Sequence, residues 1–297
     1  MKTHPSPEKF RLVLTGASGG IGQKLAEAMA PFSATMLLVG RNANALVALQ
    51  NELNKINPAL TVSIAACDLG TAQGRETVLN TAQGMPGGIN LLVNNAGVLD
   101  FHGFATQDEA MIESLIHTNL ISPILLTRKL LPLLQNGQAR LPLPSPPQPA
   151  GEGDAVSLRE ADMSWAQVVN IGSAFGDIGY PGFAAYCASK FGLRGFSQAL
   201  RRELSDSRIR VRYFAPRATR TGINSSAVNR MNAELNTAMD EPEIVASAFL
   251  KFLAGNKMES VLGWPENLYV FVNRLRHQLT DKAIGKQLAI IKKYLPV

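Results

Sequence analysis

The sequence has few charged residues for its length. Charged residues make up 18% of the 297 positions, whereas the apolar types make up 46%. A chain of this length buries enough surface to hold a core without disulfides or a metal. Because charge is low and apolar content is high, many segments should be buried on two faces, which excludes a disordered chain. One large domain is therefore expected.

Cysteine is also scarce, with only Cys67 and Cys187. Two cysteines are too few for a disulfide scaffold, and they lack metal-ligand spacing, so we interpret both as packed thiols and expect no metal site. The N-terminus has no apolar signal-peptide region, and we find no predominantly apolar stretch of about twenty residues. We therefore expect a cytoplasmic protein.

Aromatic residues make up only 6% of the chain, and they form no base-stacking cluster. A nucleic-acid partner is therefore not expected, despite a net charge of +6. The positive charge is compatible with attraction to phosphates or to anionic lipid.

Short β-branched or leucine-rich runs alternate with helix-length amphipathic segments. Strands are predicted at 11–14, 35–39, 62–66, 91–94, 168–171, 210–214 and 260–262, and helices at 21–30, 44–56, 71–83, 109–134, 184–204 and 242–253. This alternation predicts an α/β fold with a single doubly wound (Rossmann-type) parallel sheet and helices on both faces. Ligands bind such sheets beyond the carboxyl ends of the strands.

Two segments depart from the alternation. Residues 135–164 are rich in proline and glycine and lack a sustained period, so we interpret them as an exposed insertion. Residues 265–297 carry apolar residues at helical spacing among lysines and arginines, which predicts a basic amphipathic helical extension. The predicted organisation is thus a domain over 1–264, containing the insertion, followed by an extension over 265–297.

A glycine-rich loop follows the first predicted strand, with the sequence Thr15-Gly16-Ala17-Ser18-Gly19-Gly20-Ile21-Gly22. Glycines permit close approach of a pyrophosphate, and the following helix N-terminus offers free N–H donors. A glycine cluster alone could be a simple turn, but its place between strand and helix favours a nucleotide site. The pattern TGxxxGxG resembles the motif of the short-chain dehydrogenase/reductase family.

The second predicted strand ends at Gly40-Arg41, without the carboxylate that would hold an NAD ribose. A guanidinium can pair with the 2′-phosphate of NADP, whereas a carboxylate would repel it. We therefore predict NADP(H), with NAD(H) the less favoured cofactor, although Arg41 could also be an ordinary solvated arginine.

The resemblance spans residues 9–263 and includes an NNAG signature, Asn94-Asn95-Ala96-Gly97. It implies that Asp68 contacts the adenine and that Thr219 and Thr221 follow the sixth strand near the carboxamide and pyrophosphate. The implied cofactor-binding residues are Gly16, Ser18, Gly19, Gly20, Ile21, Gly22, Arg41, Asp68, Leu69, Asn95, Ala96, Gly97, Tyr186, Lys190, Pro216, Thr219 and Thr221.

Tyr186 and Lys190 are four residues apart in a predicted helix, so their side chains share one face. An adjacent ammonium favours a phenolate and should lower the pKa of Tyr186 from its ordinary value of about 10. With Asn119 and Ser173 they resemble the catalytic tetrad of the family. The resemblance implies that Tyr186 exchanges the proton, Ser173 binds the same substrate oxygen, Lys190 binds the nicotinamide ribose, and Asn119 holds a water through its backbone.

Arg217 departs from the family pattern, which has glycine after Pro216. A left-handed backbone there would be strained, and we expect the side chain either to contact a phosphate or an anionic substrate group or to be exposed. Residues 222–240 carry apolar residues among small polar ones, which predicts a mobile lid with an apolar inner face. Together with Phe175, Ile178, Tyr180 and Phe183, they favour a lipophilic substrate, although core or dimer packing explains them equally.

These features predict an NADP(H)-dependent oxidoreductase that transfers hydride between nicotinamide and the carbonyl or secondary alcohol of a 3-oxoacyl, steroid-like or other lipophilic substrate. The alternatives are a catalytically silent NADP(H)-sensing regulator and, less favoured, a sugar-nucleotide epimerase. The resemblance implies a homodimer or homotetramer that pairs through helices 109–134 and 184–204. The basic extension is expected to cover the core or a subunit interface, and the competing hypothesis is peripheral contact with an anionic membrane.

Overall fold

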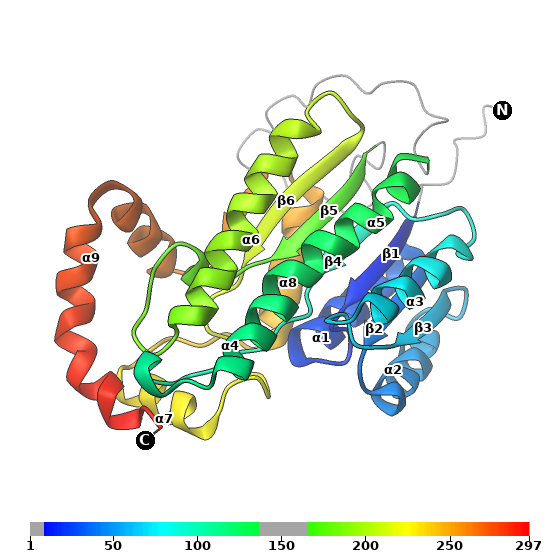
Figure 1. The fold of residues 1–297 in the computed structure, drawn as a ribbon. Helices are drawn as coiled ribbons and strands as arrows, with labels where there is room; N and C mark the ends of the chain where they lie inside the picture. Colours follow the sequence, from blue (N-terminus) through cyan, green and yellow to red (C-terminus); the bar gives the residue numbers. More distant parts are fainter. Residues whose placement is uncertain (1–8, 137–164, 297) are drawn as a thin grey trace.

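The computed structural model describes residues 9–136 and 165–296 (Figure 1). The interpretation of residues 135–164 as an exposed insertion therefore lies outside the described residues, apart from the first two, which end a helix. All seven predicted strands are present, within two residues at each end. They are β1 (Phe10–Thr15), β2 (Ser33–Gly40), β3 (Thr61–Ala66), β4 (Leu91–Asn94), β5 (Ala166–Ile171), β6 (Ile209–Ala215) and β7 (Glu259–Val261).

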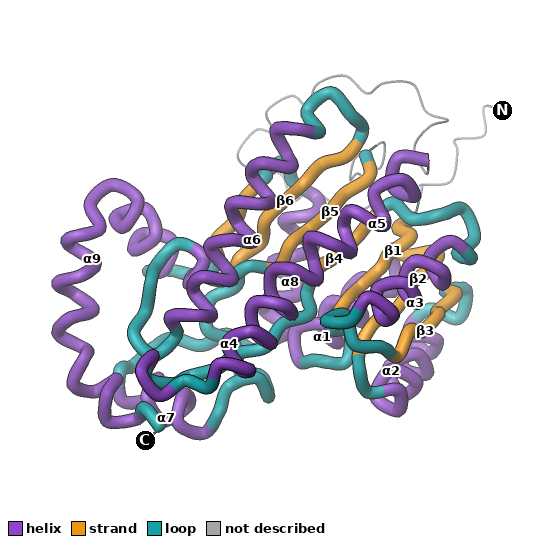
Figure 2. The backbone as a smooth tube through the Cα atoms, in the orientation of Figure 1, coloured by secondary structure: helices purple, strands orange, loops and turns teal. Residues whose placement is uncertain are grey.

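The strands form one sheet in the order β3-β2-β1-β4-β5-β6-β7, and every neighbouring pair is parallel. The chain reverses its direction of winding between β1 and β4, where α/β sheets bind their ligands. Figure 2 shows the loops after these strands gathered at one end of the sheet. The predicted doubly wound α/β fold is confirmed.

Helices cover both faces of the sheet, because alternate strand residues point to opposite sides. On one face, Leu12, Leu14 and Leu38 pack in a core with α1 (Gly20–Met29), α2 (Ala43–Ile56) and α8 (Pro242–Ala254). On the other face, Val13 and Val39 pack with α3 (Ala72–Gln83), α5 (Ser122–Asn136) and the end of α6 (Ala184–Glu203). The low charge content of the chain is explained by strands buried on both faces.

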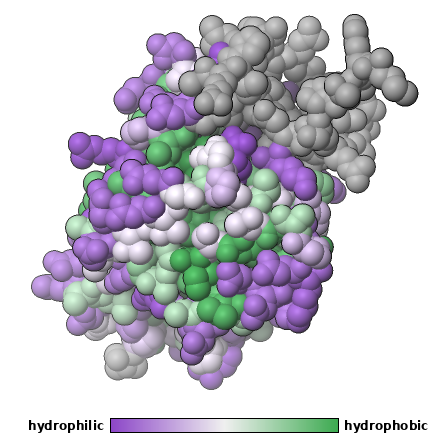
Figure 3. All heavy atoms as spheres, turned by 90° about the vertical axis from the view of Figure 1, so that its right-hand side faces the viewer, coloured by the Kyte–Doolittle hydropathy of each residue, from purple (hydrophilic) through white to green (hydrophobic). Residues whose placement is uncertain are grey.

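The β3 edge of the sheet lies on the side of the molecule that Figure 3 faces. Hydrophilic side chains there surround an apolar area. In β3 both end residues are exposed, three are partly buried and only Ala65 is buried, unlike the fully buried pattern of β4, β5 and β6. This difference follows from position, because β3 has a neighbouring strand on one side alone among the described strands.

One predicted helix is built from three pieces, α4 (Glu109–Ile116), the π-helical turn η3 (His117–Ile121) and α5. Within the described residues, this stretch is the one that is long and apolar enough to cross a membrane by length and composition. The prediction that the chain has no such stretch is therefore wrong by length and composition. Leu126, Leu130 and Leu134 of this stretch are buried in the core against the sheet, and helices that cover a sheet commonly have this composition.

The extension forms α9 (Glu266–Tyr294), which extends beyond the sheet and returns to α7 (Ser226–Glu234) (Figure 1). Arg276 has non-helical dihedral angles and divides α9 into a first arm, residues 266–275, and a second arm, residues 277–294. Ile291 of the second arm is buried against Val228 and Met231 of α7. The predicted amphipathic helix is present, and its second arm covers the segment that the sequence predicts as a lid.

Arg212 lies in the middle of β6 and is 1% exposed. Its guanidinium donates hydrogen bonds to Gln167, to the Phe252 carbonyl in the last turn of α8, and to the Gly255 carbonyl just after α8, at 2.9 Å. It also lies 4.0 Å above the Phe252 ring. These bonds satisfy carbonyl groups that have no partner within the helix, so Arg212 ties α8 to the sheet.

We predict that Arg212→Met lowers the free energy of unfolding by about 3 kcal/mol, because several buried carbonyls lose their donor. Urea denaturation followed by circular dichroism measures this loss. Arg202→Met, on the exposed end of α6, is the matched control and should unfold like the wild type. Equal stability of the two variants would contradict this role of Arg212.

Candidate functional site

A cavity of about 900 Å³ lies at the carboxyl ends of the strands. It is lined by the loops after β1, β2, β3, β4, β5 and β6, and by residues of α7 and α9. Every residue that the sequence predicts for the cofactor lines it, and so do Ser173, Tyr186 and Lys190. Asn119 is not among the lining residues and lies behind Gly97, which is one of them.

The glycine-rich loop is folded so tightly that side chains cannot enter it. Gly16 has a φ of 63°, and a Cβ on Gly22 would lie 2.0 Å from the Gly16 carbonyl oxygen. A Cβ on Gly20 would lie 2.7 Å from the Thr221 methyl group. Helix α1 begins at Gly20, and within the described chain no side chain caps its N-terminus. The loop thus presents backbone N–H groups and the positive end of the helix dipole to the cavity.

The NNAG segment joins this loop to the centre of the sheet. The Asn95 side chain donates to the carbonyls of Thr15 and Gly16, at 3.0 and 3.1 Å. The Thr15 hydroxyl in turn accepts from the backbone N–H groups of Asn95 and Ala96. The ends of β1 and β4 are therefore held in fixed register where the cofactor would lie.

Gly40, Arg41 and Asp68 line the far end of the cavity, beyond the glycine-rich loop. Arg41 is exposed, so its guanidinium is available to an anionic group. A Cβ on Gly40 would lie 3.1 Å from the Ser18 hydroxyl, which places Gly40 against the loop. Asp68 accepts a hydrogen bond from Gly70 N–H at 2.8 Å, which fixes the turn after β3.

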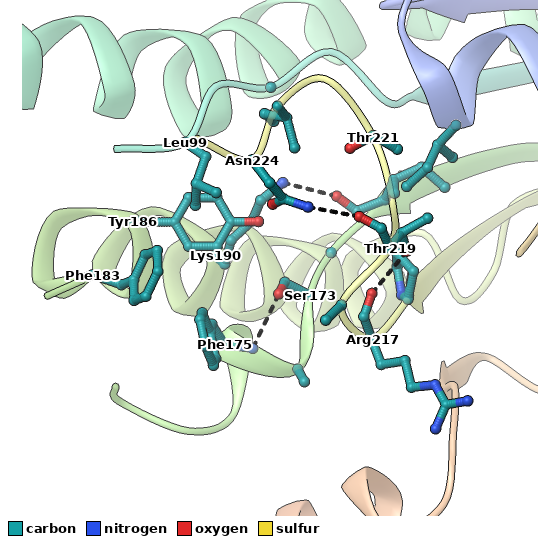
Figure 4. A pocket seen from close by; sticks show the side chains of 18 of the residues that line it. Leu99, Ser173, Phe175, Phe183, Tyr186, Lys190, Arg217, Thr219, Thr221 and Asn224 are labelled. Atoms are coloured by element: carbon teal, nitrogen blue, oxygen red, sulfur yellow. Dashed lines mark hydrogen bonds between the residues drawn. The ribbon is translucent and has the colours of Figure 1, made fainter. Parts of the chain in front are cut away.

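Tyr186, Ser173 and Lys190 meet at the other end of the cavity (Figure 4). Ser173 follows β5, and its hydroxyl accepts from the Phe175 N–H at 3.2 Å. Tyr186 and Lys190 lie one turn apart on α6, with the Lys190 ammonium 5.7 Å from the Tyr186 ring centroid. The ammonium donates to the Ile171 carbonyl at 3.1 Å, which anchors it at the end of β5.

Asn119 lies in the π-helical turn and is 1% exposed. Its side chain accepts from the Val98 N–H at 2.8 Å and donates to the Val98 carbonyl at 2.9 Å. It also donates to the Ser189 hydroxyl at 3.2 Å. Asn119 thus joins the loop after β4 to α6.

Burial determines the pKa values of the two titratable groups. It raises the pKa of Tyr186 to about 12, against a lowering by its hydrogen bond with Ser173. Burial also lowers the pKa of Lys190 to about 8. The expectation that Lys190 lowers the pKa of Tyr186 is therefore wrong, because desolvation of the buried phenol has the largest effect.

The expectation that Arg217 is exposed is wrong, because its side chain is half-buried, whereas its contact with a phosphate or an anionic substrate group stays a prediction. Its side chain points away from the pocket in Figure 4 and forms a two-pronged ion pair with Asp240, at 2.6 and 2.9 Å. It also reaches Glu266, the first residue of α9, at 3.4 Å. Among the described residues other than glycine, only Asn236 has a positive φ, so Arg217 is not strained.

The loop after β6 closes the cavity above the glycine-rich loop. Thr219 pairs with Asp240 in an isolated β-bridge, and the Asn224 side chain donates to the Thr219 carbonyl at 2.8 Å. Thr221 packs against Gly20, as its proximity to a Cβ there indicates. This loop is thereby fixed both to the α1 terminus and, through Arg217, to α9.

Aromatic side chains form one wall beside Tyr186. Phe175 stacks on Tyr180 with centroids 5.0 Å apart, and Phe183 lies 5.2 Å from Phe175. The Tyr180 hydroxyl donates to Gln287 of the second arm at 2.9 Å. Apolar residues of the lid and α9 also line the cavity: Val228, Met231, Leu268, Val272, Ala283 and Ile284. The loops after β4 and β5 add Leu99 and Ile178.

Sequence reasoning missed the residues that support Ser173. The buried Tyr213 hydroxyl accepts from the Ser173 N–H at 3.4 Å, and a Cβ on Gly172 would overlap the Tyr213 ring. Asp177, in the same loop, binds Arg274 of α9 at 2.7 Å. The sequence offers one indication of this support, the glycines that precede Ser173 and Asp177. A Cβ on Gly172 or on Gly176 would overlap the Tyr213 side chain, so both positions must be glycine for the tyrosine to fit.

The residues present fit a nicotinamide dinucleotide. The glycine cradle would be blocked by side chains at Gly20 or Gly22, yet it opens to the cavity. The uncapped α1 terminus suits a pyrophosphate. Arg41 and Tyr186 line the same cavity, so one extended molecule can reach from one to the other.

A family model described as short chain dehydrogenase matches residues 11–140 and 155–232. The ketoacyl reductase HetN of Nostoc sp. is 28% identical over 254 residues, which cover 84% of this chain and 77% of that protein. A 3-oxoacyl-(acyl-carrier-protein) reductase of Rattus norvegicus is 30% identical over 202 residues, covering 68% of this chain and 72% of that protein.

Solved structures give the same result for the fold. A short-chain dehydrogenase from Sphingobium yanoikuyae in complex with NADPH has a TM-score of 0.68 at 25% identity, and the match covers 91% of this chain and 95% of that one. A short-chain dehydrogenase from Streptomyces avermitilis has a TM-score of 0.71 at 23% identity, covering 94% and 98%.

We predict that Lys190→Met stabilises the ligand-free protein at pH 7 by about 2 to 3 kcal/mol. The folded pKa of about 8 is below the ordinary value of 10.5, so burial of the charge costs stability in full below pH 8. This cost should disappear as the pH rises from 8 to 10.5. Urea denaturation across this range measures the difference, with the exposed Lys251→Met as control. A pH-independent difference would refute the assignment.

Proposed function

The chain belongs to the short-chain dehydrogenase/reductase family of oxidoreductases, which act on ketone and alcohol groups with a nicotinamide cofactor, and we propose that this member uses NADP(H) on a lipophilic substrate. The observation that carries the proposal is the meeting of Ser173, Tyr186 and Lys190 at one end of a cavity whose other end holds the glycine cradle and Arg41. When bound, the nicotinamide supplies or accepts the hydride.

The proton follows a separate route through the chain's own residues. In the reductive direction, the Tyr186 hydroxyl gives its proton to the substrate oxygen, which becomes an alcohol. Ser173 donates a hydrogen bond to the same oxygen and stabilises the charge that develops there. The Lys190 ammonium, held at the Ile171 carbonyl, binds the ribose hydroxyls. Asn119 holds the β4 loop and α6 together and, through its backbone, positions the water that returns a proton.

The preference for NADP(H) is supported by the charge at the adenosine end. Arg41 is exposed at the cavity, and the preceding residue is Gly40 rather than a carboxylate. A guanidinium binds a 2′-phosphate by charge-assisted hydrogen bonds. We propose Ser18, Asp68 and the glycine-rich loop as its partners in holding the adenosine and pyrophosphate.

An apolar substrate is supported by the wall beside Tyr186. Phe175, Tyr180 and Phe183 stack there, and the lid adds Val228 and Met231. Among the charged residues that line the cavity, Arg217 and Glu266 pair with each other, and Arg217 also pairs with Asp240. A 3-oxoacyl or steroid-like ketone fits such a lining, and two of the similar proteins are named as ketoacyl reductases.

The proposal extends to organisation and location. We propose that residues 1–264 are the catalytic domain and that 265–297 are an extension that completes the substrate cavity. Exposed Met111 and Phe191 on α4 and α6 support a homodimer or homotetramer that pairs through these helices. The free thiols of Cys67 and Cys187 fit a reducing compartment, as a cytoplasmic protein requires.

We predict that Tyr186→Phe lowers kcat with NADPH and a lipophilic ketone by about 1,000-fold, because the proton donor is lost while the ring remains. NADPH oxidation followed by absorbance measures turnover, and NADPH fluorescence measures cofactor binding, which should be retained. Tyr294→Phe, at the end of α9, is the control. Unchanged turnover would refute the mechanism, and binding without turnover in the wild type would favour the sensing alternative.

We predict that Arg41→Gln weakens NADPH binding by about 10- to 100-fold and leaves NADH binding unchanged, because one charge-assisted contact is removed. Titration with each cofactor measures both dissociation constants. The exposed Arg128→Gln, on α5, should bind both cofactors like the wild type. An equal loss for NADH and NADPH would show that Arg41 does not read the 2′-phosphate.

A further inference from the structure

The first arm of α9 presents a row of large apolar side chains to solvent. Phe271 and Leu275 are 59% and 68% exposed, and Trp264 just before the helix is 69% exposed. Leu268, Phe271 and Leu275 are spaced by three and four residues, so they lie on one helical face. We call Trp264, Leu268, Phe271, Leu275 and, beyond the kink, Leu279 the apolar row.

The apolar row is continuous with the substrate cavity. Leu268 and Leu279 are 40% and 52% exposed, yet both also line the cavity. Each arm therefore contributes to the rim, the first through Leu268 and the second through Leu279. An apolar molecule in contact with the apolar row could therefore move along Leu268 or Leu279 into the cavity while staying against apolar side chains.

Positive charge surrounds the row. Residues 266–294 contain six lysines and arginines but only Glu266 and Asp281 as acids. Glu266 pairs with Arg217, whereas no ion pair holds Arg276, Lys282, Lys286 or Lys292 within residues 9–136 and 165–296. Leu279, Lys282 and Lys286 are spaced by three and four residues, so lysines and the end of the apolar row share one face.

The row is held in place from behind. Arg274 binds the buried Asp177, Gln287 accepts from Tyr180, and Lys293 binds Glu234 of α7 at 2.7 Å. The inner side of α9 is thus committed to the site, and its outer side is left as a rigid surface. Apolar and aromatic residues beside unpaired lysines are the composition of helices that lie in the interface of an anionic bilayer.

We propose that the outer side of α9 docks on an anionic lipid bilayer, with the apolar row inserted at the level of the head groups and the cavity mouth facing the lipid. The lysines contact phosphate or carboxylate head groups. The docking itself does not depend on the proposed reaction. Its use, the delivery of an apolar substrate from the bilayer to the cavity, rests on that reaction.

Co-sedimentation of the full chain with phosphatidylcholine vesicles, with and without phosphatidylserine, tests the proposal. The wild type should bind the anionic vesicles more strongly, and added salt should weaken this binding. Leu275→Asp should lower the partition coefficient at least about 10-fold, since a leucine is lost from the apolar phase. Lys282→Gln with Lys286→Gln should lower it about 30-fold. The controls, Ile56→Asp on α2 and Lys251→Gln with Lys257→Gln, should bind like the wild type.

Two further measurements separate the possible failures. Leu275 and Phe271 do not line the cavity among its described residues, so Leu275→Asp should reduce a water-soluble ketone at the wild-type rate. Retained turnover with equal binding to neutral and anionic vesicles overturns the docking but not the reaction. Loss of turnover in the wild type overturns the reaction instead. A wild-type dimer that Leu275→Asp dissociates, with no vesicle binding, assigns the row to a second copy and overturns the bilayer.

Discussion

The close approach of β1 and β4 at the Gly16 carbonyl is the constraint on which the site depends. This oxygen accepts from Gly19 N–H at 3.1 Å and from the Asn95 side chain at 3.1 Å, and it excludes a Cβ at Gly22. The segment after β4, the glycine-rich loop and helix α1 therefore all contact this one oxygen atom. Since the sheet changes winding direction here, the same contact opens the cavity and orients the α1 terminus toward it.

Strand and helix positions could be predicted from the sequence because they depend on local pattern. Apolar runs on β4, β5 and β6 and the spacing of Tyr186 and Lys190 are visible without the fold. The predicted cofactor residues all line one cavity because they lie at strand ends, which a parallel sheet brings to the same edge. Topology thus converts a local pattern into a shared site.

Contacts between distant segments could not be predicted in this way. Arg217 pairs with Asp240 and Glu266, which lie 23 and 49 residues away, and nothing near Arg217 in the sequence indicates them. Tyr213 supports Ser173 across two strands, 40 residues apart. The expected lowering of the Tyr186 pKa failed for a related reason, because burial depends on the whole fold whereas the lysine spacing is local.

Arg217 also fixes the extension to the site, because it pairs with Glu266 at the start of α9. A Cβ on Gly263 would lie 2.4 Å from the Arg217 side chain, so the chain can turn into α9 only where that residue is glycine. Arg217 thereby connects the loop above the cofactor cradle to the first turn of α9, and Arg274 connects α9 to the loop that carries Ser173. A displacement of α9 would disturb both loops. No residue of the apolar row takes part in these two ion pairs, so the row stays exposed while α9 is held to the site.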